Sequence, residues 1–247
     1  MKWETHRRIT LEVCRYYGIP YSEIIANAST KPDESPDYHV TPTVGGYLRK
    51  VRHHAPSTPE VILVYLAEAR RRFLYGEPFA ETLGRALHYL QDLPIDPAEH
   101  DFLEEVLEKT PVDLSAIRSA REMSIPPHLF KRIVKAIGIR RKPDEIMWAA
   151  CFLSSLAVKM VINPDVPPDV RKKYRRARIL NIMAILLPWI LTPLGIKFVV
   201  MAIILSFLIW LLDIFEISTL KFDYLWAGFD YSPYTAKNTT MKDIKTG

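Results

Sequence analysis

The chain is poor in the residues that mark a disulfide framework. Its 247 residues include two cysteines, Cys14 and Cys151, which are far apart and lie in apolar surroundings. A small secreted scaffold needs more cysteine pairs, so we expect reduced core thiols. Glutamine occurs once, at Gln91. Residues 1–8 lead directly into a charged amphipathic pattern, which is not the pattern of a signal peptide.

The sequence also lacks clear strand patterns. No stretch of alternating polar and apolar residues bounded by turns stands out, and apolar residues recur instead at helical spacing. Glycine and proline break this pattern repeatedly, and residues 29–45 resemble a loop. The predicted fold is all-α. We expect helices over residues 5–17, 22–28, 59–74, 79–92, 98–109, 113–122, 127–137, 143–162 and 167–178.

Charge is nearly absent from one long segment. Between Ile179 and Phe215 the only charged residues are Lys197 and Asp213. Residues 179–196 and 198–215 are each near the lower limit of about 17–25 residues for a transmembrane helix. Because both halves are apolar all round, a buried hairpin of a soluble protein is the weaker interpretation. We therefore expect a membrane-embedded helical hairpin.

The turn chemistry of residues 192–195 (Thr-Pro-Leu-Gly) supports the hairpin. A single tilted helix kinked at Pro188 and Pro193, or a hairpin that dips into the bilayer without crossing it, remain open alternatives. The basic run 171–178 directly precedes the apolar segment and accounts for much of the net charge of +5. This placement favours lipid head groups over nucleic acid as the partner and puts the rest of the chain on the cytoplasmic face.

These patterns predict three parts. Residues 1–178 would form a helical domain, residues 179–215 the membrane hairpin, and residues 216–247 an aromatic C-terminal tail. The tail has rings suited either to a membrane interface or to packing against the helical domain.

Two histidines of the predicted helical domain carry a carboxylate four residues later. They are His88 with Asp92, and His100 with Glu104. Residues spaced by four lie on one face of a helix, so each pair can reach one metal ion or two adjacent ions. The spacing therefore makes these four residues candidate metal ligands.

Residues 83–92, Leu-Gly-Arg-Ala-Leu-His-Tyr-Leu-Gln-Asp, resemble the central motif of the zinc-dependent phospholipase C family, which includes fungal zinc nucleases of single strands. The resemblance covers about residues 3–108. It implies a multi-helix phospholipase-C-like bundle with a zinc site, in which Asp33 is both a ligand and a base for the attacking water. The implied metal ligands are Trp3, His6, Asp33, His53 or His54, His88, Asp92, His100 and Glu104.

The chain departs from the family pattern in two places. Met1 and Lys2 precede Trp3, which is the first residue in the family, and residues 93–99 lack a family histidine. We therefore expect one to three zinc ions. The expected function is a membrane-anchored, zinc-dependent phosphoric-ester hydrolase, similar to phospholipase C, acting on phospholipid head groups. A tethered nuclease or phosphatase and a catalytically degenerate membrane-anchored scaffold are the alternatives.

Overall fold

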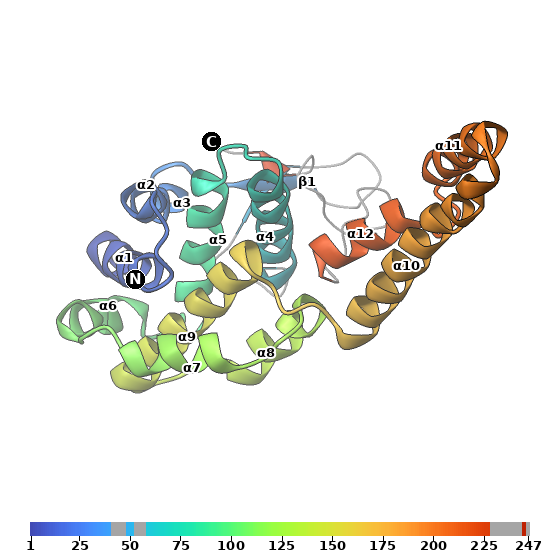
Figure 1. Cartoon of the computed structure of the whole chain (residues 1–247). Helices are drawn as coiled ribbons and strands as arrows, with labels where there is room; N and C mark the ends of the chain where they lie inside the picture. The colour runs from blue at the N-terminus through green and yellow to red at the C-terminus, as the bar shows by residue number, and fades with distance from the viewer. Residues whose placement is uncertain (41–47, 52–57, 228–243, 246–247) are drawn as a thin grey trace. The chain divides into compact units, whose positions relative to one another are not determined.

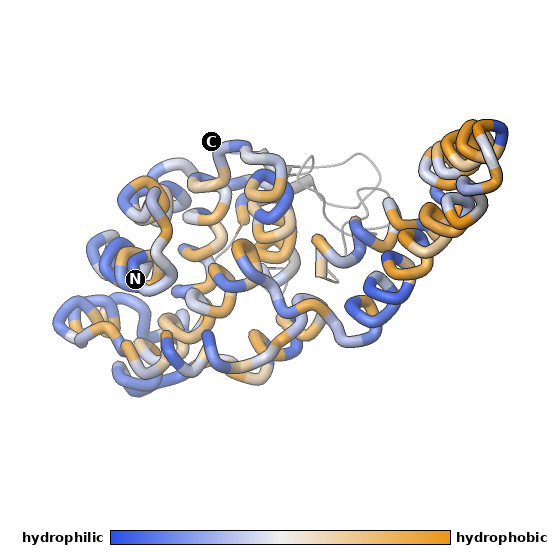
Figure 2. The backbone as a smooth tube through the Cα atoms, viewed as in Figure 1, coloured by the Kyte–Doolittle hydropathy of each residue, from blue (hydrophilic) through white to orange (hydrophobic). Residues whose placement is uncertain are grey.

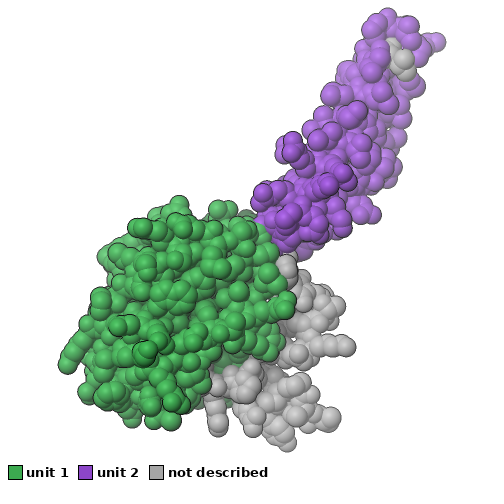
Figure 3. Space-filling view, turned by 90° about the horizontal axis from the view of Figure 1, so that it is seen from below, with its two compact units in different colours: residues 1–165, 229–247 green, residues 166–228 purple. Residues whose placement is uncertain are grey.

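The computed structural model describes residues 1–40, 48–51, 58–227 and 244–245 (Figure 1). The described chain is mostly helical, which confirms the predicted all-α class. It divides into two compact units, shown in different colours in Figure 3. Unit 1 comprises Met1–Asp165 with Phe229–Gly247, and unit 2 comprises Val166–Gly228.

The helices of unit 1 other than α3 begin and end close to the predicted positions, because glycine and proline separate strongly periodic segments. Residues 127–137 divide into a 3-10 turn, η1, and a following helix. The elements are α1 (Trp3–Tyr16), α2 (Ser22–Ala28), α3 (Lys31–Glu34), α4 (Thr58–Leu74), α5 (Ala80–Asp92), α6 (His100–Lys109), α7 (Leu114–Glu122), η1 (Pro127–Leu129), α8 (Phe130–Ile137) and α9 (Pro143–Ile162).

Two helices form the centre of unit 1. Helix α5 packs against α2, α4 and α9, and every residue from Thr82 to Asp92 is buried. Helix α9 is long and apolar enough to cross a membrane, but 83% of its apolar window is buried inside the structure. It is therefore the core helix of this unit. Because α5 is buried on all sides, its polar residues must find partners within the protein.

A small antiparallel sheet was not predicted from the sequence. It has the strand order β2-β1-β3, formed by β1 (Tyr38–Val40), β2 (Leu48–Lys50) and β3 (Ile244–Lys245). Tyr38 pairs with both Lys50 and Lys245. Together with α3, β1 lies in residues 29–45, where we had expected a loop. Strands of two or three residues are too short to show alternation.

Unit 2 is a helical hairpin followed by a third helix. Its elements are α10 (Pro168–Leu186), the 3-10 segment η2 (Leu187–Leu194), α11 (Ile196–Leu211) and α12 (Ile217–Trp226). Helix α10 runs continuously through the predicted boundary at residue 178, and Figure 2 shows its change from hydrophilic to hydrophobic. Helix α12, which falls in the predicted tail, packs back against α10.

Candidate metal centre

Helix α5 brings His88 and Asp92 to one face, as their spacing predicts. His88 is fully buried and Asp92 is 1% exposed. Nδ1 of His88 donates a hydrogen bond to the Ser29 carbonyl oxygen at the end of α2, over 2.8 Å. Nε2 then lies 3.4 Å from Asp33 Oδ1 and 3.5 Å from Asp92 Oδ2. A backbone carbonyl that accepts from one ring nitrogen is the usual way to orient a metal-binding histidine.

His6 comes to the same place from α1. It is fully buried, and its Nδ1 donates to Gln91 Oε1 over 2.6 Å. The Gln91 amide is itself oriented, because its Nε2 donates to the hydroxyls of Thr10 and Ser154. With Nδ1 engaged, His6 Nε2 lies 3.4 Å from Asp92 Oδ1 and makes no hydrogen bond within the part of the chain that the structure describes. A buried ring nitrogen without a hydrogen bond that lies near carboxylates is suited to bind a cation.

The two imidazoles and two carboxylates form one cluster. The rings of His6 and His88 stack with centroids 4.3 Å apart. One ligand atom each from His6, Asp33 and His88 lies within 4.8 Å of the other two. The two oxygens of Asp92 approach the Nε2 atoms of the two histidines. Two imidazole nitrogens and two carboxylates are a donor set suited to a divalent transition metal such as Zn²⁺.

Burial shifts the pKa values of His6 and Asp33 in opposite directions, yet their surroundings leave both groups in the form that binds a metal. It lowers the pKa of His6 to about 3, and the neighbouring His88 adds to this effect, while Asp92 opposes it. Burial alone would raise the pKa of Asp33, but its hydrogen bond to His88 and the charge of His88 outweigh that effect, so the net pKa is lowered. At neutral pH the cluster therefore presents the His6 imidazole without a second proton and the Asp33 carboxylate ionised.

The structure brings together only some of the predicted ligands. His100 Nε2 and Glu104 Oε1 on α6 lie 3.6 Å apart and pair with each other. The Met1 ammonium group lies 3.3 Å from Glu104 Oε1 and 2.6 Å from Asp92 Oδ1. Trp3 stands at the start of α1 with its side chain 52% exposed. The predicted ligands His53 and His54 lie outside the described residues.

A buried ion pair fixes the segment that follows Asp33. Arg85 on α5 donates to Asp37 Oδ1 over 2.7 Å and to the Ser35 carbonyl over 3.2 Å, and the Tyr89 hydroxyl donates to Asp37 Oδ2 over 2.9 Å. Burial raises the pKa of Asp37, and Arg85 and Tyr89 only partly counteract this. This contact joins α5 to the chain just after α3, so it helps to hold Asp33 near His88.

No protein-family model, curated protein or solved structure matched the chain.

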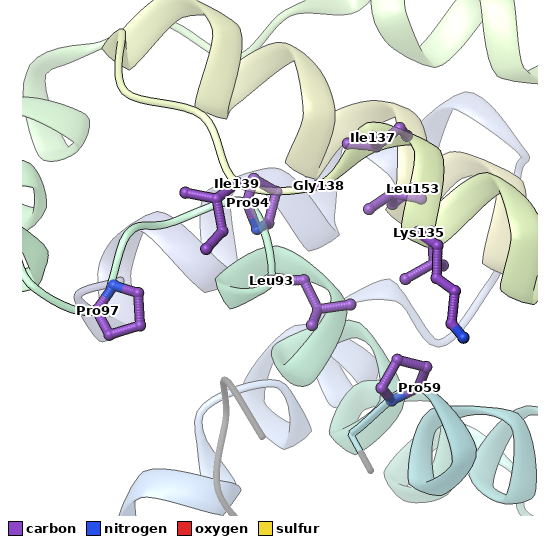
Figure 4. Close-up of a pocket in the computed structure, with 10 residues that line it drawn as sticks. Pro59, Leu93, Pro94, Pro97, Lys135, Ile137, Gly138, Ile139 and Leu153 are labelled. Carbon is purple, nitrogen blue, oxygen red and sulfur yellow. The ribbon is translucent and has the colours of Figure 1, made fainter. Parts of the chain in front are cut away.

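A separate pocket of about 200 Å³ lies where the chain leaves α5 and meets α8 and α9 (Figure 4). Leu93, Pro94, Ile137 and Ile139 line it, and Lys135 contributes the only charge of its described lining. None of the cluster residues belongs to this lining. The pocket is therefore separate from the buried cluster.

Proposed function

We propose that the chain is a metal-dependent phosphoric-ester hydrolase held at a membrane surface, with one divalent cation bound by His6, Asp33, His88 and Asp92. The observation that carries this proposal is the buried His6 Nε2, which faces Asp92 and has no hydrogen-bond partner among the described residues. Two histidines oriented through Nδ1, with two carboxylates beside their Nε2 atoms, match the ligand and outer-shell pattern of a zinc site.

The chemistry follows from the ligands. A divalent cation at this place would activate water near neutral pH and neutralise charge on phosphoryl oxygens. Nε2 of each histidine faces the carboxylates, because Gln91 and the Ser29 carbonyl accept the Nδ1 protons of His6 and His88. Asp33 is the most exposed of the four residues. It is therefore the best placed to accept a proton from an incoming water.

Unit 2 supports the membrane part of the proposal. Its apolar side chains are exposed along α10, η2 and α11, and no described residue of α10 or η2 is buried. The basic run 171–178 lies immediately before this surface and suits anionic head groups. A hydrolase tethered in this way meets phospholipid at a high local concentration, so we propose a phospholipid head group as the substrate.

Metal content and activity of the purified full-length chain test this proposal. We expect at least one zinc per chain by mass spectrometry, and chelator-sensitive hydrolysis of a soluble phosphodiester. His88→Ala should abolish both. His100→Ala is the matched control, because His100 is a partly exposed histidine outside the cluster. It should retain the zinc of the cluster and most of the activity.

The outcomes separate the alternatives. Substoichiometric zinc would overturn the metal site. Stoichiometric zinc without hydrolysis of any phosphodiester would favour an anchored scaffold. Faster turnover of single-stranded nucleic acid than of phospholipid vesicles would contradict the phospholipid substrate and indicate a tethered nuclease.

A further inference from the structure

The hairpin of unit 2 has a fixed register between its two legs. Trp189 Nε1 donates to Ser206 Oγ over 3.1 Å, and Ser206 Oγ donates to the Ile185 carbonyl over 2.9 Å. Continued away from the tip, this pairing places the end of α11 at Leu211 beside residues 180–184, which directly follow Arg178 and Ile179. The basic run of one leg therefore ends close to the level at which the other helix ends.

Between that level and the tip the hairpin is apolar all round. The legs contain no charged residue from Ile179 onward except Lys197, which stands at the tip directly after the turn. Large apolar side chains are exposed on every face of the two legs. Among the described residues of α11, Ala202 is the one that is buried. A helix pair of this composition is suited to lipid.

The legs come close to the length of a full crossing. Helix α11 has 16 residues, which extend about 24 Å at about 1.5 Å per residue, against a hydrocarbon core of about 30 Å. The four-carbon stem of Lys197, which stands at the tip, can extend its ammonium group outward and help to cover the remaining distance of about 6 Å. The η2 segment lengthens the other leg, because a 3-10 helix rises about 2.0 Å per residue.

A hairpin that ends inside the bilayer would leave polar groups in hydrocarbon. The Lys197 ammonium would lie near the bilayer centre. The start of α11, like every helix start, has first-turn N–H groups without intrahelical partners, and these need water or head groups. Both requirements are met when the tip reaches the opposite surface.

We infer that the hairpin crosses the bilayer twice and places Lys197 in the head-group layer opposite the basic half of α10. Helix α12 folds back along α10, with the rings of Tyr174 and Tyr224 5.0 Å apart. Both chain connections between unit 2 and unit 1 therefore leave from the basic end. Arg and Lys are concentrated there, so this end faces the cytoplasm and the tip faces outward. The inference depends on the membrane attachment proposed above.

Cysteine labelling of the full chain tests the topology. Ile196→Cys and Leu194→Cys place a thiol on either side of the turn and retain Lys197, and Thr219→Cys is the matched control on α12. The native Cys14 and Cys151 are buried, so the unsubstituted chain gives the background. We expect a membrane-impermeant maleimide to label the two tip variants in bacterial spheroplasts only, and Thr219→Cys in inverted membrane vesicles only.

Other labelling patterns overturn the inference in different ways. Tip thiols shielded in both preparations and reactive only in detergent would show a hairpin that dips without crossing. Tip thiols labelled from the same side as Thr219→Cys would show that the hairpin is not inserted. Release of the chain from membranes by alkaline carbonate would overturn the attachment itself, and with it that part of the proposed function.

Discussion

Gln91 Oε1 lies 2.6 Å from Nδ1 of His6, and this contact decides which nitrogen of the imidazole faces Asp92. The amide cannot rotate freely, because its Nε2 is bonded to Thr10 and Ser154. The only glutamine in the sequence is thus a buried residue that orients a candidate ligand. It acts through His6 and does not itself face the metal position.

Replacing Gln91 should weaken metal binding. Gln91→Leu removes the acceptor of the His6 Nδ1 proton, so His6 loses its fixed tautomer and orientation. Loss of such outer-shell partners typically lowers metal affinity about 10–100-fold. Gln91→Glu keeps an acceptor at this position and should retain most of the affinity. Competition titration with a zinc indicator measures both variants, and equal affinities for Gln91→Leu and the unsubstituted chain would contradict the role of Gln91.

The sequence predicted the helices of unit 1 other than α3, and the His88–Asp92 pair, because both depend on local spacing. The lack of charge and the turn residues 192–195 also predicted the apolar hairpin, but not the continuity of α10. The side chains change from basic to apolar near position 178, and the helical backbone continues through this change. The expected boundary followed the composition, whereas the units divide at residue 165.

The partners of the ligands could not be predicted in the same way. Gln91 meets a histidine 85 residues earlier, and Arg85 meets Asp37 from 48 residues away. Their roles exist only after α1, α5 and the segment after α3 have packed together. Asp37 lies among the prolines and polar residues of an apparent loop, and no local pattern distinguishes it as a buried ion-pair partner.

The Asp37–Arg85 ion pair should be sensitive to loss of one partner. Arg85→Leu leaves the Asp37 carboxylate buried without its cation, and breaking a buried pair in this way typically costs about 3–5 kcal/mol. The double variant Asp37→Leu with Arg85→Leu should recover much of this loss. Urea unfolding measures each free energy. Arg72→Ala is the control, since its partly exposed pair with Glu68 should contribute less than about 1 kcal/mol.

Gly84 allows α2 and α5 to approach closely. A Cβ atom at this position would lie 2.5 Å from Ala28 Cβ and 2.6 Å from the Ile25 carbonyl oxygen. Gly84→Ala should therefore force the helices apart and destabilise the protein by about 1–3 kcal/mol. Because α2 also ends at the Ser29 carbonyl that orients His88, zinc affinity should fall as well. Unchanged melting temperature and affinity would contradict this account of the helix contact.

The metal-free protein should lose stability as the pH falls below about 6.5. Burial lowers the pKa of His6 to about 3, whereas an exposed imidazole in the unfolded chain has a pKa near 6.5. At pH values between about 3 and 6.5, His6 binds a proton in the unfolded state but not in the folded state, so a lower pH favours unfolding. Urea titrations in EDTA from pH 7.5 to pH 4 measure the slope. A His6→Gln variant lacks this ionisation and should show a smaller decline over the same range.

Zinc should stabilise the folded chain in proportion to its occupancy of the cluster. A ligand that binds only the folded state at about 100 times its Kd adds about 2.7 kcal/mol to the free energy of unfolding. We expect this increase when zinc is added to the metal-free full-length chain, and its reversal by EDTA. His88→Ala should show no zinc-dependent increase in stability, because it lacks the imidazole nitrogen that lies near both Asp33 and Asp92. His100→Ala should show the full increase if the cluster alone holds the ion. A loss of the zinc effect in His100→Ala would instead indicate that α6 contributes a ligand, and would move the site toward the larger ligand set that the motif resemblance implies.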